Sequence, residues 1–388
     1  MTDSIPINPD VLRWARETAG LSLEDVAGEL GRKSIDAQTI EAWERGAGSP
    51  SFPQLETLAH KIYKRPLAVF FFPVVPFEET PKTQFRTLPD AVVDDLPPAM
   101  VKLYRKAKLF QLYLEELYEG AKPVEMPFLD RFELDPNSHP ASITGAIRKA
   151  IGISIEEQSK WRSADTAFKR WREALEASGI FVFKDAFRNN DYSGFCLYGE
   201  KYPIIFVNNS MPESRQVFTL FHELGHLLRH SGGIDFRSRE AVRSFQGYYL
   251  NVEVRCNQFA NGFLVPKEVL DSFELRVSEK DIERMAEYFS VSREVILRSY
   301  LDRGLVDEDY YDRMAAKWAG QARAKEDGKS GRSYYYNIRA YLGERYINLV
   351  YGQYYRNRIT IDHIAEYLNV KVKNLPSLEH IVLEGGKP

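Results

Sequence analysis

The sequence predicts a mainly α-helical protein of several domains, with one small β-sheet near the middle of the chain. Over most of the 388 residues, apolar side chains recur at the spacing of amphipathic helices. Three short runs rich in β-branched and aromatic residues lie between residues 179 and 208. A helical pattern carrying His-Glu-Leu-Gly-His follows them directly. We therefore expect an N-terminal helix-turn-helix bundle (1–75), a Pro-rich connection and helix (76–140), an α+β domain with a three-stranded sheet (141–310) and a helical C-terminal region (311–388).

The composition is that of an ordinary globular protein. Apolar residues make up 44% of the chain and charged residues 28%. No apolar run reaches the roughly 18 residues of a membrane span, and the first residues lack the features of a signal peptide. Two cysteines argue against a disulfide framework and favour a reducing compartment. We expect a cytoplasmic protein without a membrane partner, and the net charge of −3 gives no general attraction to nucleic acid.

Residues 1–75 have the pattern of a helix-turn-helix bundle. Four short helical patterns follow one another, with glycines such as Gly31 and Gly46 at their ends. Ser22 precedes the second pattern and is a typical helix N-cap. Short helices joined by glycine-centred turns are typical of helix-turn-helix domains.

Three segments make a resemblance specific: Leu21-Ser22-Leu23-Glu24-Asp25-Val26-Ala27, Thr39-Ile40-Glu41-Ala42-Trp43-Glu44-Arg45-Gly46 and Ser49-Pro50-Ser51. They resemble XRE-type (lambda-repressor-like) helix-turn-helix domains. The resemblance implies that a helix at about 36–45 enters the major groove of operator DNA. It also implies that three side chains face the DNA: Lys33, Gln38 and Glu41.

The charge of this region favours DNA binding less than its pattern does. Residues 1–75 carry eight Lys or Arg and ten Asp or Glu, a net charge of −2. Contacts to phosphate dominate the affinity of proteins for DNA, so a monomer of this domain is expected to bind weakly. Two interpretations stay open: a DNA-binding domain, or a helical bundle that contacts protein.

In the stretch before the His-Glu-Leu-Gly-His motif, the spacing of apolar residues changes from that of helices to that of strands. Helices are expected at about 99–120, 142–151 and 155–177, and strands at 179–183, 192–198 and 203–208. These elements should bury the helix that follows. An edge strand of such a sheet can bind an extended peptide by adding it as a further strand.

The motif His222-Glu223-Leu224-Gly225-His226 lies within a helical pattern over roughly 213–230. Residues four apart on a helix project from the same face, so His222 and His226 can bind one Zn²⁺ ion. Glu223 stands where a carboxylate can take a proton from water at the metal, which is the arrangement of metalloproteases. Gly225 costs a helix about 1 kcal/mol relative to Ala, which indicates that another segment packs closely there.

A third metal ligand is needed, and His230 fails on geometry. Eight residues separate it from His222, a rise of about 12 Å, which one ion with bonds of about 2 Å cannot span. Asp235 and Glu240 are candidates within residues 231–246, which we interpret as a mobile, solvated loop. Glu253 lies on a predicted helix, 252–264, and a rigid helix holds a ligand better than a loop does. Glu253 is therefore preferred. Asn257, one turn later, is expected to support the ligands, while Cys256 is interpreted as a small buried residue.

A wider set of segments resembles the ImmA/IrrE family of metallopeptidases over roughly 140–310. They are Ser193-Gly194-Phe195, Pro203–Asn208, Phe218–Leu228, Glu253–Ala260, Leu264-Val265-Pro266, Phe289–Ser292 and Leu301–Val306. The resemblance implies a zincin-like domain in which His222, His226 and Glu253 bind zinc and Glu223 is the general base. The family usually has Ala where this chain has Cys256.

The combination of the two resemblances implies a regulatory protein of a bacterium or phage. An XRE-type domain fused to an ImmA/IrrE-type peptidase recurs there, and family members cleave or control repressors in stress response or in mobile elements. The expected partners are a repressor or toxin protein, operator DNA and a second copy in a homodimer. The alternative is an antitoxin or transcriptional regulator that acts by binding, with a non-catalytic zinc site.

The C-terminal region is rich in tyrosine and begins after a charged segment, 322–333, that we interpret as a linker. Tyr334, Tyr335 and Tyr336 are followed by Tyr341, Tyr346, Tyr351, Tyr354 and Tyr355 at helical spacing. A tyrosine-rich helical face suits a protein interface, and packing within the chain is the other interpretation.

Overall fold

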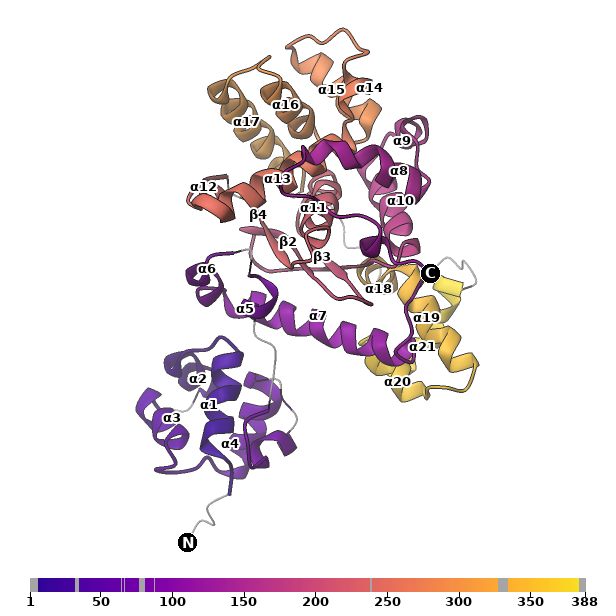
Figure 1. Ribbon diagram of the computed structural model, residues 1–388. Helices are drawn as coiled ribbons and strands as arrows, with labels where there is room; N and C mark the ends of the chain where they lie inside the picture. The colour runs from indigo at the N-terminus through magenta and orange to yellow at the C-terminus, as the bar shows by residue number, and fades with distance from the viewer. Residues whose placement is uncertain are drawn as a thin grey trace. The chain divides into compact units, whose positions relative to one another are not determined.

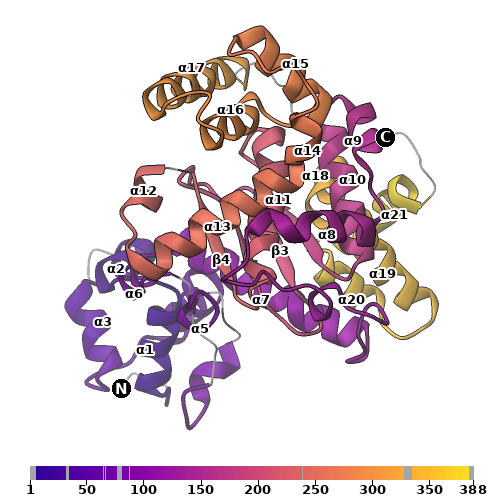
Figure 2. The same ribbon diagram turned by 45° about the horizontal axis from the view of Figure 1, so that its top comes forward.

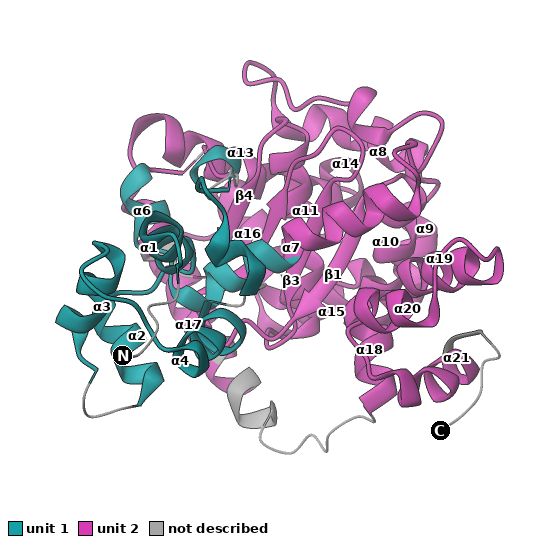
Figure 3. Cartoon of the chain, turned by 90° about the horizontal axis from the view of Figure 1, so that it is seen from below, with its two compact units in different colours: residues 1–84, 90–106 teal, residues 85–89, 107–388 magenta. Residues whose placement is uncertain are grey.

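The structure, a computed structural model, describes residues 6–31, 35–63, 65, 67–76, 81–86, 88–237, 239–326 and 334–383. The chain forms two compact units (Figure 3). Unit 1 comprises residues 1–84 and 90–106, and unit 2 comprises residues 85–89 and 107–388. In the described part of the chain, no helix has the length and apolarity to cross a membrane.

Unit 1 contains the predicted helix-turn-helix bundle. Ser22 caps its second helix through a capping box, in which the Ser22 hydroxyl accepts the Asp25 amide and the Asp25 carboxylate accepts the Ser22 amide. Gly31 ends that helix in the left-handed conformation, φ +63°, that glycine adopts without strain. The helices are α1 (Pro9–Thr18), α2 (Leu23–Leu30), α3 (Ala37–Glu44), α4 (Phe52–Glu56), a π-helical turn (Thr57–Tyr63), a 3-10 turn (Leu67–Phe71), α5 (Pro81–Gln84) and α6 (Asp90–Asp94).

Unit 2 carries the sheet and most of the longer helices. α7 (Pro98–Leu117) crosses the boundary between the units. The sheet strands are β1 (Phe181–Asp185), β2 (Tyr192–Leu197), β3 (Ile204–Asn208) and β4 (Gly233–Phe236). The helices are α8 (Thr144–Ile151), α9 (Ile155–Trp161), α10 (Ala164–Ala177), α11 (Glu213–Leu227), α12 (Arg239–Arg243), α13 (Gly247–Leu264), α14 (Lys267–Leu270), α15 (Glu279–Phe289), α16 (Arg293–Asp302), α17 (Glu308–Glu326), α18 (Tyr334–Leu342), α19 (Glu344–Tyr355), α20 (Ile361–Tyr367) and α21 (Leu375–Leu383), with short 3-10 turns at Phe128–Asp130, Pro140–Ile143 and Val372–Asn374.

The sheet has four strands in the described residues, so the prediction of three strands was wrong. Its order is β1-β3-β2-β4, with β1 parallel to β3 and the other pairs antiparallel. The added strand β4 lies within residues 231–246, which were interpreted as a solvated loop. Four residues containing Gly233 and Asp235 give almost no periodic signal. The strand forms because β2 supplies its hydrogen bonds and because Asp235 has buried partners.

The two faces of the sheet are covered by different helices (Figure 1). Successive side chains of a strand point to opposite faces. On β1 and β3, Val182 and Ile205 join the core around α11, whereas Phe183 and Phe206 pack against Phe110 of α7. Tyr346 of α19 meets Phe183 edge-on, with ring centroids 5.2 Å apart. On the other face, helix α11 is enclosed between the sheet, α10 and α13.

The predicted helix 155–177 is divided into two helices. Arg162 adopts a left-handed conformation, φ 52°, and ends α9. The Ser163 hydroxyl then accepts the amide hydrogen of Thr166 and begins α10. Apolar periodicity continues across this break, and only the cap geometry divides the helix.

The tyrosines of the C-terminal region divide between core and surface. Tyr346, Tyr351 and Tyr367 are buried, while Tyr334 and Tyr355 are 50% and 57% exposed. The predicted linker 322–333 was partly wrong, since α17 continues to Glu326. Residues 327–333 lie outside the described part of the chain.

Candidate metal centre

Helix α11 places the His-Glu-Leu-Gly-His motif in the interior of unit 2. Every side chain from Gln216 to Leu227 is buried. The Gln216 amide donates to the Met211 carbonyl and holds the loop that enters the helix. A helix buried all round keeps its side chains in fixed rotamers, which suits a site that depends on position.

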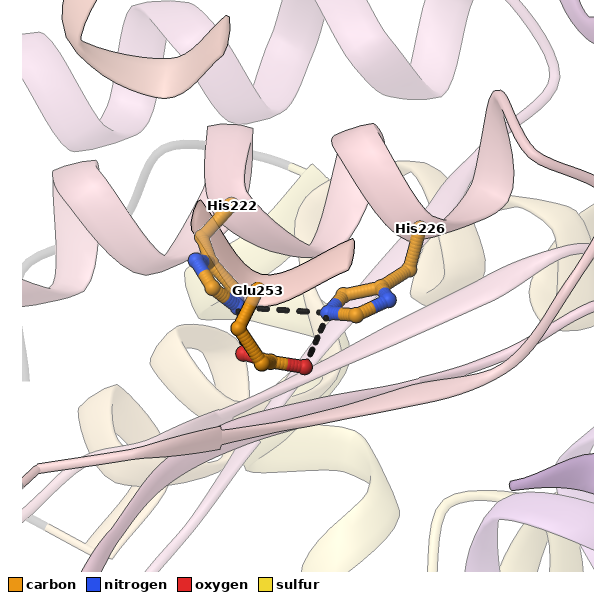
Figure 4. Close-up of side chains that lie close together, drawn as sticks. All are labelled: His222, His226 and Glu253. Atoms are coloured by element: carbon orange, nitrogen blue, oxygen red, sulfur yellow. Dashed lines mark hydrogen bonds and ion pairs between the residues drawn. The ribbon is translucent and has the colours of Figure 1, made fainter. Parts of the chain in front are cut away.

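Three side chains from two helices meet at one point (Figure 4). The Nε2 atoms of His222 and His226 are 3.2 Å apart. The Glu253 carboxylate, from α13, lies with one oxygen 3.3 Å from His222 Nε2 and the other 3.3 Å from His226 Nε2. All three residues are at most 1% exposed. The three residues predicted as ligands therefore lie together.

The spacing of these atoms fits a metal ion. A tetrahedral ion with bonds of about 2.0 Å keeps its ligand atoms roughly 3.3 Å from one another, and the measured separations are 3.2–3.3 Å. Both oxygens of Glu253 are buried and lie 3.3 Å from an imidazole Nε2. When the imidazoles are neutral and do not donate from Nε2, these oxygens need another partner, because a buried polar group without one costs free energy. Two imidazoles and a carboxylate are a usual donor set for zinc.

Neighbouring groups fix the two imidazoles. Nδ1 of His222 lies 3.1 Å from the Asn257 side-chain oxygen, so the ring can donate its Nδ1 hydrogen to Asn257 and turn Nε2 toward the cluster. Gly233 lies against the other ring, where an added Cβ would come within 2.3 Å of His226.

Gly225 lies against Cys256 of α13, and a Cβ added to Gly225 would be 3.2 Å from Cys256. The predicted close packing at Gly225 is confirmed, and α11 and α13 lie side by side (Figure 2).

Charges in the cluster stabilise protonated histidines next to an ionised Glu253. Burial lowers the pKa of His222, but the carboxylates of Asp235 and Glu253 outweigh burial and raise it to about 9. Burial raises the pKa of Glu253, but the two histidines outweigh burial and lower it to about 2. A metal ion would displace these protons, because it needs neutral imidazoles.

Glu223 lies on the side of α11 that faces β2. Its carboxylate is fully buried, and an added Cβ on Gly194 would be 3.7 Å from one of its oxygens. Burial raises the pKa of Glu223 to about 7, and the neighbouring His226 and His222 act against this rise. A carboxyl group with this pKa can accept and return a proton near neutral pH.

Asp235 and the excluded His230 have partners of their own outside the cluster of three ligands. The Asp235 carboxylate is buried in β4, where it accepts the Thr219 hydroxyl at 2.8 Å and pairs with Arg215 at 2.6 Å. His230 follows α11 in a left-handed conformation, and its Nδ1 lies 2.8 Å from the Tyr198 hydroxyl. Glu240 lies in the short helix α12.

A groove of about 1160 Å³ opens beside the cluster. His222 and Asn257 line it near the metal centre, and Arg215 lines it from the start of α11. Its lining continues over α15, α16 and α17 as far as Trp318. Sequence reasoning did not identify Arg215, although it stands seven residues before His222, on the same face of the helix.

The residues predicted to face DNA lie in and before α3. Gln38 is exposed. Glu41 is partly exposed and pairs with Arg45 one turn later on the same helix. Lys33 lies outside the described residues.

Comparison with known families identifies two parts of the chain. Residues 175–299 match the family model described as the IrrE N-terminal-like domain, and this family is zincin-like. The match runs from the end of α10 into α16 and includes the whole His222, His226 and Glu253 cluster. Residues 10–63 match a helix-turn-helix domain, which covers α1 to the π-helical turn. No curated protein matched the chain. The chain therefore joins an N-terminal helix-turn-helix domain to a metallopeptidase-like IrrE N-terminal-like domain.

Proposed function

We propose that this protein is a zinc-dependent endopeptidase that cleaves, and so controls, a regulatory protein such as a repressor or toxin of a bacterial or phage system. One observation carries the proposal. Two imidazole nitrogens and the Glu253 carboxylate form a buried triangle beside a groove, and the helix of the two imidazoles also carries the buried carboxylate of Glu223. A purely structural zinc site closes its coordination with a fourth protein ligand. Within the described residues, the group that meets here contains three.

His222, His226 and Glu253 would hold the zinc ion, and Asn257 would orient His222. A bound zinc ion would lower the pKa of its water toward 7 and polarise the carbonyl of the bond to be cleaved. Glu223 takes the proton from the attacking water and returns it to the leaving amine. Glu223 would start the reaction as the ionised carboxylate, the form that can accept a proton.

The groove supports a polypeptide as substrate. Pockets for small molecules span roughly 300–1,000 Å³, and this groove, at about 1160 Å³, is larger. Its lining also carries charges of both signs: three arginines (Arg215, Arg237 and Arg293) and three acidic residues (Asp235, Glu287 and Glu294). A mixed lining of this kind suits an extended chain better than one charged metabolite.

The test is the Glu223→Gln variant, loaded with zinc and incubated with a peptide library from a digested bacterial proteome. We expect the zinc content of the wild type and a loss of cleavage of at least about 10³-fold, since the general base is absent. The control is Glu274→Gln, which makes the same substitution at an exposed residue outside the groove lining. Undiminished cleavage by Glu223→Gln would remove the mechanism.

We further propose that the helix-turn-helix domain directs the protein to operator DNA through α3. Gln38 supports this role because its side chain is exposed and an amide can read a base edge. The net charge of −2 over residues 1–75 predicts weak binding with a shallow salt dependence. A DNA shift assay over a salt series measures both properties, and no shift at low salt would contradict the role.

The same acidic charge favours a second candidate, a regulator or antitoxin that acts by binding protein and carries a non-catalytic zinc site. The C-terminal helices, with exposed Tyr334 and Tyr355, offer an interface for such a partner. This candidate predicts that Glu223→Gln retains full biological activity, whereas the peptidase predicts that it loses it.

A further inference from the structure

Arg215 lies in the groove at a fixed distance from the metal centre. It and His222 are seven residues apart on α11, so they share one face and are separated by about 10 Å along the helix axis. Both residues line the groove. An extended polypeptide advances about 3.3 Å per residue, so this distance corresponds to about three residues of a bound chain.

Three neighbours hold the Arg215 guanidinium in place. Its Nε donates to the Ser193 hydroxyl of β2 at 3.1 Å, and Nη2 donates to the Asp235 carboxylate of β4 at 2.6 Å. The guanidinium carbon also lies 5.3 Å from the centre of the Phe218 ring. Ser193 is fully buried and Asp235 is 2% exposed, so both anchors are rigid parts of the sheet.

The third nitrogen of this guanidinium is available to a ligand. The Arg215 side chain is 25% exposed, and its Nη1 donates to no group within the described residues. A donor that is already immobilised loses little conformational entropy when it forms a further hydrogen bond. The anchors therefore prepare Nη1 to bind an oxygen atom in the groove.

The charge of the site selects the kind of oxygen. Asp235 already neutralises Arg215 at 2.6 Å, so the pair offers a hydrogen bond without a net positive charge. A carboxylate would meet the repulsion of Asp235, while a main-chain carbonyl would not. A main-chain carbonyl is also present at every residue of any polypeptide.

We propose that Arg215 is a substrate-positioning residue that binds a main-chain carbonyl of the substrate about three residues from the bond to be cleaved. The Asp235 and Ser193 side chains hold the guanidinium in register with the metal centre. The inference rests on the peptidase function proposed above and adds its substrate class, an extended polypeptide that spans the metal centre and the start of α11.

The experiment uses nested peptides that are built from a sequence that the zinc-loaded wild-type protein cleaves in the proteome library. Each peptide is shortened by one residue at a time on either side of the cleaved bond. The variants are Arg215→Met, and Arg215→Met combined with Asp235→Asn, which leaves no unpaired buried charge. Arg276→Met is the control, since Arg276 is an exposed arginine that does not belong to the groove lining. Zinc content and thermal midpoint are measured for each protein.

The wild type and Arg276→Met should lose about tenfold in kcat/KM when the peptide no longer reaches the third residue on one side. The double variant should cleave long peptides at the rate of the shortened ones, with no further loss on shortening. If the double variant keeps the wild-type dependence on length, the inference is wrong while the peptidase function stands. Enrichment of Asp or Glu at one position of the cleaved peptides would also overturn it, in favour of carboxylate recognition. If the wild type cleaves nothing, the peptidase function fails and the inference fails with it.

Discussion

At the scale of single residues, the metal centre depends on side chains that touch the ligands as well as on the ligands themselves. Asn257 lies one turn after Glu253 on α13 and meets Nδ1 of His222 at 3.1 Å. Such a partner fixes the tautomer and orientation of the ring and makes Nε2 the free donor atom. The predicted supporting position of Asn257 agrees with this contact, while its role in metal binding stays a proposal.

We predict that Asn257→Ala weakens zinc binding by about 10–100-fold, because the His222 ring loses its orienting acceptor. Competition with a chromophoric chelator measures the affinity. Gln258→Ala, at the next position of α13, is the control and should bind zinc as the wild type does. Equal affinity of the two variants would show that Asn257 does not orient the ligand.

At the scale of elements, the short strand β4 shapes the centre although it supplies no ligand. Gly233 leaves room for the His226 ring, Asp235 anchors Arg215, and the strand pairs with β2. Gly194 of β2 serves a related purpose, since a Cβ there would lie 2.4 Å from the Thr219 side chain. The absence of a side chain at these two glycines therefore allows the sheet to pack closely against α11.

We predict that Gly233→Ala displaces His226 and reduces the zinc content of the purified protein at least tenfold, since the new Cβ would overlap the ring at 2.3 Å. The control is Gly352→Ala in α19, where an added Cβ meets nothing within 4 Å. That change should stabilise the helix by about 0.5–1 kcal/mol. Full zinc content in Gly233→Ala would contradict the steric argument.

The capping box of α2 gives a prediction about pH. Hydrogen bonds from the Ser22 amide and hydroxyl hold the pKa of Asp25 below its usual value. A lowered carboxyl pKa contributes stability above the unfolded value of about 3.9, and this stability is lost as pH falls through the folded pKa. Below about pH 4, we expect the hydrogen-exchange protection of α2 in the wild type to decrease. The decrease should be less than about 1 kcal/mol, because solvent screens this exposed group. Asp25→Asn should show weaker protection at neutral pH and no such fall, and an identical fall in both proteins would assign it to another group.

At the scale of the whole molecule, the C-terminal helices are part of unit 2. Phe110 and Phe183 stack on each other, and the Tyr346 ring meets both of them edge-on, with centroid distances of 5.4 and 5.2 Å. The buried Arg172 of α10 donates to the carbonyl of Ala340 at 2.7 Å and so holds the end of α18. The separate domain predicted at 311–388, and its role as an interaction module, stay predictions.

We predict that Tyr346→Ala lowers the free energy of unfolding of unit 2 by about 3–5 kcal/mol, because it removes a buried aromatic ring from both of its contacts. Tyr355→Ala, at a site 57% exposed, should change it by less than about 0.5 kcal/mol. Urea unfolding followed by circular dichroism measures both. A small effect of Tyr346→Ala would mean that the C-terminal helices add little to the stability of unit 2.

The sequence by itself determined the helix-turn-helix bundle, the helix of the His-Glu-Leu-Gly-His motif and the preference for Glu253, because helical periodicity and i, i+4 spacing are local properties. It also indicated close packing at Gly225. Only the tertiary structure decided the fourth strand, the break at Arg162 and the setting of Arg215. Each of these depends on a partner distant in the sequence or on cap geometry: β2 for β4, the Ser163 cap for the break, and Ser193 and Asp235 for Arg215. A four-residue strand and a single arginine carry no periodic signal in the sequence. Their conformation is therefore determined by the residues that contact them in the folded protein.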